Sequence, residues 1–130
     1  MQKKRDHNYE SAPLITNFPL FNPQILLEIG NQDFVHKTIN NVIQAMKTKI
    51  QVLENAIFNE DQLIIDEISH WMKGSLGTCG LYHVAHIASE INVASKKNCS
   101  SQELELYNQL RTDWCRTQTV IKNYFSELNQ

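Results

Sequence analysis

The sequence predicts an all-α protein, an antiparallel four-helix bundle with a short extra helix at its N-terminal end. Three observations support this fold class. Four segments repeat apolar residues at every third or fourth position, as helices with one buried face do. No segment alternates apolar and polar residues over a useful length, so no strand is expected. The connections are short, and amphipathic helices with short connections pack as antiparallel bundles. Another all-α arrangement is the alternative, because periodicity does not determine topology.

The composition fits one ordinary domain. The chain has 130 residues, of which 42% are hydrophobic and 20% charged, enough apolar material to fill a core. Its formal net charge is −2, and the only basic cluster is the run Lys3, Lys4 and Arg5. A nucleic-acid-binding domain usually carries a basic stripe. We therefore expect no nucleic-acid partner.

Cysteine usage and hydropathy indicate the compartment. The three cysteines, Cys79, Cys99 and Cys115, are odd in number and contain no CxxC pair, so a reducing compartment is the simpler interpretation. No signal peptide follows the first charges, and no apolar run approaches the ~20 residues of a membrane span. We expect a soluble cytoplasmic monomer without direct membrane contact.

The chain begins with a lead-in and a short helix. Residues 1–20 contain Pro13 and Pro19 and no sustained periodicity, so they are predicted to be a flexible tail or linker. The bundle is predicted to occupy residues 21–130. Residues 23–29 can form a short helix that starts at a proline and is ended by Gly30.

Four longer helices are expected after this short one. Their apolar stripes run over residues 35–57, 64–79, 84–94 and 104–128. Asn59 can cap the second of them, with Gln62 at the third helical position, and Ser100 with Glu103 has the spacing of a capping box before the fourth.

One face of the second long helix carries a histidine. On a helical wheel its core arc holds these residues: Ile64, Ile65, Ile68, Trp71, Met72, Ser75, Leu76 and Cys79. His70 points away from that arc. Lys73, Gly74 and Gly77 fall close to His70 on the wheel, and Asp66 and Glu67 flank the same side. Glycine weakens a helix by up to ~1 kcal/mol relative to alanine. Glycines on this face would leave room for another protein to approach His70.

A solvent-facing histidine is a plausible nucleophile. A large fraction of an ordinary imidazole is uncharged near neutrality and has a free ring lone pair. A phosphoryl group on the ring would place anionic oxygens within reach of Lys73. The alternative, which wheel geometry leaves open, is that His70 is a surface histidine without a role.

The residues around His70 resemble the signature of the histidine-containing phosphotransfer (HPt) domain family. His70, Lys73, Gly74, Ser75 and Gly80 stand as H-x-x-K-G-S-x-x-x-x-G. Upstream, the stretch "FNPQILLEIGNQDF" at residues 21–34 resembles the entry helix of these domains. The resemblance covers roughly residues 21–128.

This resemblance implies a phosphocarrier in a multistep two-component phosphorelay. His70 would accept a phosphoryl group from an aspartate of a receiver domain and pass it to the aspartate of a response regulator. Lys73 would be its electrostatic partner and Gly74 the clearance for docking. The domain would hold no metal, nucleotide or other cofactor, because the receiver supplies Mg²⁺, and the chain has no glycine-rich nucleotide loop or kinase signature for ATP-dependent autophosphorylation.

The partners would be two receiver domains, one in a hybrid sensor kinase and one in a response regulator. The chain could be free-standing or the C-terminal module of a hybrid sensor kinase, and the linker-like lead-in favours the module. Leu63 and Leu81, as surface apolar residues on the side of His70, would form the rim of the docking patch with Gly74 and Gly77.

The chain departs from the family pattern at three positions. Trp71 occupies a position where a small residue is common, and Leu76 is larger than usual. Many members place a glutamine near the phosphohistidine on the neighbouring helix. Asn92 matches that position as the candidate phosphate-site amide and is one methylene shorter than glutamine.

Two other functions are weaker alternatives for this sequence. His83 and His86, three residues apart with Cys79 nearby, could suggest a metal site. However, bundle metal sites usually need Glu-x-x-His pairs from two helices, which are absent, so these histidines are predicted to lie at the surface or boundary. A non-catalytic helical adaptor or receiver-docking module would explain the bundle but leaves Gly74 and Gly77 beside His70 unexplained.

Overall fold

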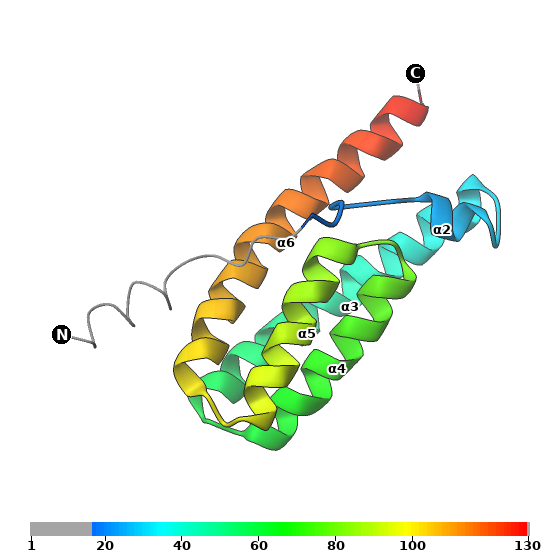
Figure 1. Ribbon diagram of the computed structural model, residues 1–130. Coiled ribbons are helices and arrows are strands. Elements are labelled where there is room, and N and C mark those ends of the chain that lie inside the picture. Colours follow the sequence, from blue (N-terminus) through cyan, green and yellow to red (C-terminus); the bar gives the residue numbers. More distant parts are fainter. Residues whose placement is uncertain (1–16, 130) are drawn as a thin grey trace.

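The computed structural model describes residues 17–129, which form five helices and no strand. Their bounds are Gln24–Leu27 (α2), Gln32–Phe58 (α3), Gln62–Thr78 (α4), Tyr82–Lys96 (α5) and Ser100–Leu128 (α6). Figure 1 shows the four long helices side by side, with α2 close to the start of α3. The predicted all-α four-helix bundle with a short N-terminal helix is confirmed. None of the helices in this part of the chain has the length and apolar character needed to cross a membrane.

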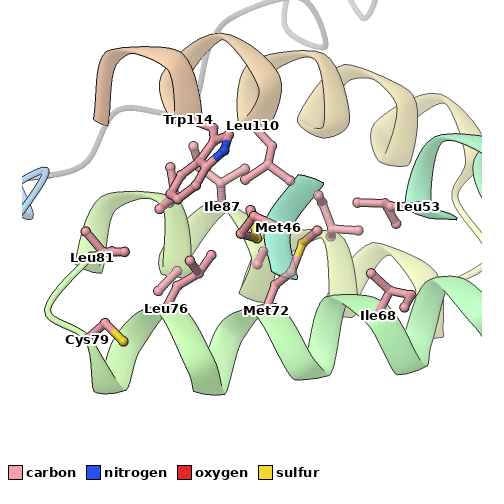
Figure 2. Close-up of a cluster of buried hydrophobic side chains, with 14 of the residues drawn as sticks. Met46, Leu53, Ile68, Met72, Leu76, Cys79, Leu81, Ile87, Leu110 and Trp114 are labelled. Atoms are coloured by element: carbon pink, nitrogen blue, oxygen red, sulfur yellow. The ribbon is translucent and has the colours of Figure 1, made fainter. Parts of the chain in front are cut away.

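All four long helices contribute to one core. Figure 2 shows their apolar side chains directed into a common space. The labelled members include Met46 and Leu53 from α3, Ile68, Met72 and Leu76 from α4, Ile87 from α5, and Leu110 and Trp114 from α6. Complete burial of such a side chain stabilises the fold by about 1.5–3 kcal/mol. The burial of one stripe of α4 therefore determines which residues of this helix face outward.

Two of the predicted helix caps are wrong. The side chain that caps α4 belongs to Asp61, whose Oδ1 accepts from the Ile64 amide at 3.3 Å, whereas Asn59 ends α3. Cys99 precedes α6 without a side-chain cap, and Ser100 is already helical. Glu103 cannot complete a capping box because its side chain is buried against α4.

The chain before α2 lies against the connection between α4 and α5. The Asn22 amide donates to the Gly80 carbonyl at 2.9 Å, and the His83 amide donates to the Pro19 carbonyl at 3.2 Å. Gly80 has a φ of +79°, and a Cβ there would collide with the Asn22 carbonyl. The predicted flexible lead-in lies outside the described residues up to position 16, but Pro19 is hydrogen-bonded to the bundle.

Candidate functional site

His70 lies in the middle of α4 and faces outward. Its neighbours on the opposite side, Ile68 and Met72, are buried in the core, and Ser69 is buried against α5. The His70 side chain is exposed and makes no hydrogen bond or ring contact with another residue of the part described here. The imidazole ring is therefore accessible from solvent.

Lys73 and Gly74 follow one turn later on the exposed side of α4. A Cβ built on Gly74 meets no atom within 4 Å, so the space above this glycine is open. Its backbone is ordinary α-helix, and no contact within the described fold requires glycine here. Glycine costs about 0.5–1 kcal/mol relative to alanine in such a position. The bundle itself therefore gives no structural reason for Gly74.

Gly77 does not share the open surface of Gly74. It is half-buried, and a Cβ there would lie 3.9 Å from the Cβ of Ala85, an ordinary contact distance. The predicted grouping of Gly77 with Gly74 as clearance is corrected by this placement, because Gly77 faces the seam between α4 and α5. The helical wheel could not anticipate this, since it does not show where the neighbouring helix lies.

The two leucines predicted to form the docking rim differ in solvent exposure. Leu63 is 70% exposed and lies two turns before His70 on α4, so it can line an outer surface. Leu81 is 0% exposed, and its prediction as a surface residue is wrong. Gly80 turns the chain before α5, and Figure 2 shows the Leu81 side chain directed toward the core cluster.

Asn92 reaches α4 from α5, one turn before His70. Its Nδ2 donates to Asp66 Oδ1 at 2.7 Å, to Ser69 Oγ at 3.0 Å and to the Asp66 carbonyl at 3.1 Å. The side chain is almost completely buried. In this structure the amide binds α4, and its contact with a phosphoryl group stays a prediction.

A shallow hollow of about 500 Å³ opens beside His70. His70, Trp71 and Gly74 line it from α4, and Val42 lines it from α3. Lys49 of α3 places its Nζ 4.9 Å from the centroid of the Trp71 ring, a cation–π contact. Trp71 is half-buried, so it forms a wall of the hollow as well as part of the edge of the core.

The site is thus an exposed histidine on one helix of a bundle, beside open space, and the whole sequence can be compared with known protein families. A family model described as "Hpt domain" matches residues 38–130, which is most of the chain and spans all or most of each long helix. The chain belongs to the Hpt domain family. Comparisons with curated proteins and with solved structures gave no match. As an Hpt domain, the protein has a histidine phosphotransfer role in a two-component phosphorelay, in which Hpt domains interact with receiver domains and response regulators.

The Hpt domain carries a charge pair beside His70 that sequence reasoning did not identify. Lys96, in the last turn of α5, places its Nζ 3.0 Å from Asp66 Oδ1. The hydrogen bonds from Lys96 and from Asn92 hold the pKa of Asp66 below its usual value. The sequence placed Asp66 on the His70 side of α4, but it offered no signal for Lys96, because the pairing register of α4 and α5 is a tertiary property.

The histidines considered as metal ligands lie elsewhere in the Hpt domain. His83 Nε2 lies 2.7 Å from Asp113 Oδ2 of α6, and His83 is buried, so its prediction as a surface or boundary residue is wrong. His86 is half-buried and packs against Phe18, with 5.3 Å between ring centroids. Residues 17–129 contain no group of three or more His, Cys, Asp or Glu side chains placed to hold a metal ion.

The buried carboxylate of this pair is held in its charged form. Burial of Asp113 disfavours its charge, but hydrogen bonds from His83, Arg116 and Gln109 outweigh this effect and lower its pKa. The His83–Asp113 pair joins α5 to α6, whereas Asn92 joins α5 to α4.

Proposed function

We propose that His70 carries the phosphoryl group of this Hpt domain, accepting it from the aspartate of one receiver domain and passing it to the aspartate of another. The observation that carries this assignment is the exposed ring of His70 beside the open space above Gly74. A receiver must bring its aspartyl phosphate into contact with the ring. Gly74 leaves room for that approach on the turn next to His70.

The other described histidines are less suited to this role. His83 is buried in its pair with Asp113. His86 is half-buried beneath Phe18. His36 is exposed near the start of α3, but its ring packs edge-on against Phe125 with 4.7 Å between centroids. None of these three has a glycine one turn away on its own helix.

The transfer is a displacement at phosphorus. A ring nitrogen of neutral His70 attacks the phosphorus of the receiver's aspartyl phosphate with its lone pair. The new P–N bond forms as the P–O bond to the aspartate breaks, and the bonding electrons leave with the receiver's carboxylate. The other ring nitrogen keeps its proton. Passage to the second receiver is the reverse reaction, with that receiver's carboxylate as nucleophile.

The electrostatic work is divided between the two proteins. Lys73, exposed one turn from His70, brings an ammonium group near the phosphoryl oxygens. The receiver supplies Mg²⁺ and the acidic pocket, so this chain needs no cofactor of its own, and positioning provides most of the catalysis. Trp71 and Val42, which line the hollow, offer apolar surface to a partner that approaches His70.

The relay would run from a hybrid sensor kinase to a response regulator. The domain would act as a monomer in the cytoplasm, and the three free cysteines support the reducing compartment. Leu63, exposed on the same helix as His70, would lie at the rim of the receiver contact.

The test is labelling by a phosphorylated receiver domain, compared between the wild type and His70→Gln. We expect His70→Gln to lose all acid-labile, base-stable label while its circular dichroism spectrum stays helical, because the side chain lies outside the core. His36→Gln is the matched control, since it removes another exposed histidine, and it should be labelled like the wild type. Full labelling of His70→Gln would show that the acceptor is another residue.

A further inference from the structure

A charge pair bridges α4 and α5 at the turn that precedes His70. Lys96 Nζ and Asp66 Oδ1 are 3.0 Å apart, and their side chains are 62% and 42% exposed. Asp66 is four residues before His70, so both stand on the same side of α4. A surface pair of this kind usually adds little to stability. Its position beside the proposed acceptor suggests another role.

The two members of the pair are held very differently. Asp66 accepts a second hydrogen bond from the buried amide of Asn92 at 2.7 Å, and Asn92 is itself bound to Ser69. The Lys96 ammonium contacts only Asp66 among the described residues. The carboxylate is therefore anchored, whereas the ammonium sits on a flexible stem with three donors. If the pair opens, the lysine moves.

Helix geometry directs both His70 and Lys96 toward the same place. Asn92 contacts Ser69 and Asp66, and further along α5 Ser95 contacts Gln62, so α4 and α5 run antiparallel. Side chains on a helix lean toward its N-terminus. His70 therefore leans over the turn of Asp66. Lys96 leans toward the N-terminus of α5. Because α5 runs antiparallel to α4, this direction also leads toward His70.

We propose that Lys96, which is paired with Asp66 in the unphosphorylated protein, serves as a second cation for the phosphoryl group once His70 is phosphorylated. This inference rests on the proposed role of His70. In the unphosphorylated protein the lysine is neutralised by Asp66. When His70 gains a phosphoryl group, which brings roughly two negative charges, Lys96 turns from Asp66 to the phosphoryl oxygens. Lys73 then approaches the group from the following turn of α4, and Lys96 approaches it from the last turn of α5.

The change of partner by Lys96 stabilises the phosphorylated state only in part. Lys96 stabilises the phosphoryl group, but it must give up its contact with Asp66, and the anchored carboxylate repels the new negative charge. The gain is therefore partly cancelled. A carrier benefits from this balance, because a phosphohistidine that is too stable would not pass its group on.

The test is the equilibrium constant for transfer between a competent receiver and this domain, measured in a double-mutant cycle of Lys96→Gln and Asp66→Asn. This constant compares the free proteins with and without phosphate, so a residue that only contacts the docked receiver does not change it. Asn at position 66 can still accept the Asn92 hydrogen bond. Lys97→Gln is the matched control, because it removes an equal charge from the adjacent exposed position.

We expect Lys96→Gln to lower the phosphorylated fraction at equilibrium, with a constant about two- to fivefold smaller than that of the wild type. Asp66→Asn should raise the constant, because it frees the lysine and removes the repulsion. Lys96→Gln should then have at least as large an effect in the Asp66→Asn background. Lys97→Gln should leave the constant within measurement error.

If the Asp66–Lys96 pair only stabilises the fold, the equilibrium constants of the four proteins should show a different pattern. The effect of Lys96→Gln would then vanish once Asp66 is neutral, and this result would overturn the inference. Unchanged constants in both backgrounds would also overturn it. Either outcome leaves the role of His70 intact as long as the wild type is labelled and His70→Gln is not, whereas labelling of His70→Gln would refute the proposed function instead.

A measurement without any receiver gives independent evidence. The domain can be phosphorylated with phosphoramidate and the ³¹P resonance followed against pH. A nearby ammonium favours the dianionic phosphoryl group, so Lys96→Gln should raise the pKa of that group, and Lys97→Gln should not. An identical ³¹P titration in wild type and Lys96→Gln would overturn the inference.

Discussion

Replacement of Gly74 by glutamine tests whether this glycine serves a partner or the helix. A Cβ at this position meets nothing within 4 Å, so the larger side chain can be accommodated without strain. Gly is about 0.8–1 kcal/mol less favourable than alanine in a helix, and glutamine lies within a few tenths of alanine. The free energy of unfolding should therefore rise by about 0.5 kcal/mol, which raises Tm by about 2–3 °C for a domain of this size.

The effect on phosphotransfer should have the opposite sign. If a receiver packs over Gly74, the added side chain must be accommodated in a close interface, which typically costs about 1–3 kcal/mol. At 1.4 kcal/mol per factor of ten, receiver-dependent labelling should fall by about 5- to 140-fold. Labelling by phosphoramidate, a small donor that needs little clearance, should change less than about twofold.

The assay is the ratio of the two labelling rates, receiver over phosphoramidate, together with a thermal melt of each variant. Gly77→Ala is the matched control, because it removes a glycine from the same helix at a position that faces Ala85. It should raise Tm and leave the ratio unchanged. If Gly74→Gln has the wild-type ratio, steric clearance is the wrong explanation for Gly74.

Other substitutions separate the site from the fold. Lys73→Ala should reduce receiver-dependent transfer about two- to fivefold and leave it detectable, as expected for an exposed cation; equal rates and equilibria in both directions would remove Lys73 from the site. Leu81→Ala should lower the free energy of unfolding by about 2–5 kcal/mol, as a fully buried leucine does, and urea denaturation measures this loss. Leu63→Ala should leave stability nearly unchanged and weaken receiver binding, measured by calorimetry; full affinity would exclude Leu63 from the interface. Asp113 has a lowered pKa in the folded state, so its charge stabilises the fold above its usual pKa, and this contribution is lost as pH falls through the folded value. The stability difference between the wild type and Asp113→Asn should therefore shrink below about pH 4, and a difference that grows there would contradict the paired geometry with His83.

The helices could be predicted because their signal is local. The apolar stripe of α4 repeats with the helix period. Of its eight predicted core members, five are buried and three are half-buried: Ile65, Ile68, Met72, Leu76 and Cys79 are buried, and Ile64, Trp71 and Ser75 are half-buried. The same wheel placed His70 on the outside, where the structure has it. Periodicity works for α4 because this helix has one core-facing side and one solvent-facing side.

The errors fall where local pattern competes with tertiary contact. Asn59 and Asp61 are both good caps two residues apart, and the turn geometry rather than the side-chain type selects Asp61. Leu81 lies in a connection, where no wheel applies, and its burial depends on the turn at Gly80. His83 finds its carboxylate partner 30 residues away in another helix.

The Asp66–Lys96 pair could not be predicted for the same reason. Its members are also 30 residues apart, and they meet only because α4 and α5 pack antiparallel in a specific register. The sequence shows each charge but not the distance between them.

The unequal lengths of the helices have a consequence for local stability. α3 has 27 residues and α6 has 29, whereas α4 has 17 and α5 has 15. In Figure 1 the C-terminal end of α6 extends past the α5 ribbon, and residues 122–129 are exposed or only half-buried. Opening of that end breaks few buried contacts, so its amides should exchange with solvent fastest among the long helices.

The segment that bears His70 has the opposite character. α4 and α5 form a hairpin of adjacent helices, closed by short-range contacts such as the Leu81 amide bond to the Leu76 carbonyl at 2.9 Å. Contacts of small sequence separation form early in folding, because they close short loops at low entropic cost. The part of the chain that meets its partners is thus expected to be among the first to fold and the last to open, while the fraying end of α6 leaves it undisturbed.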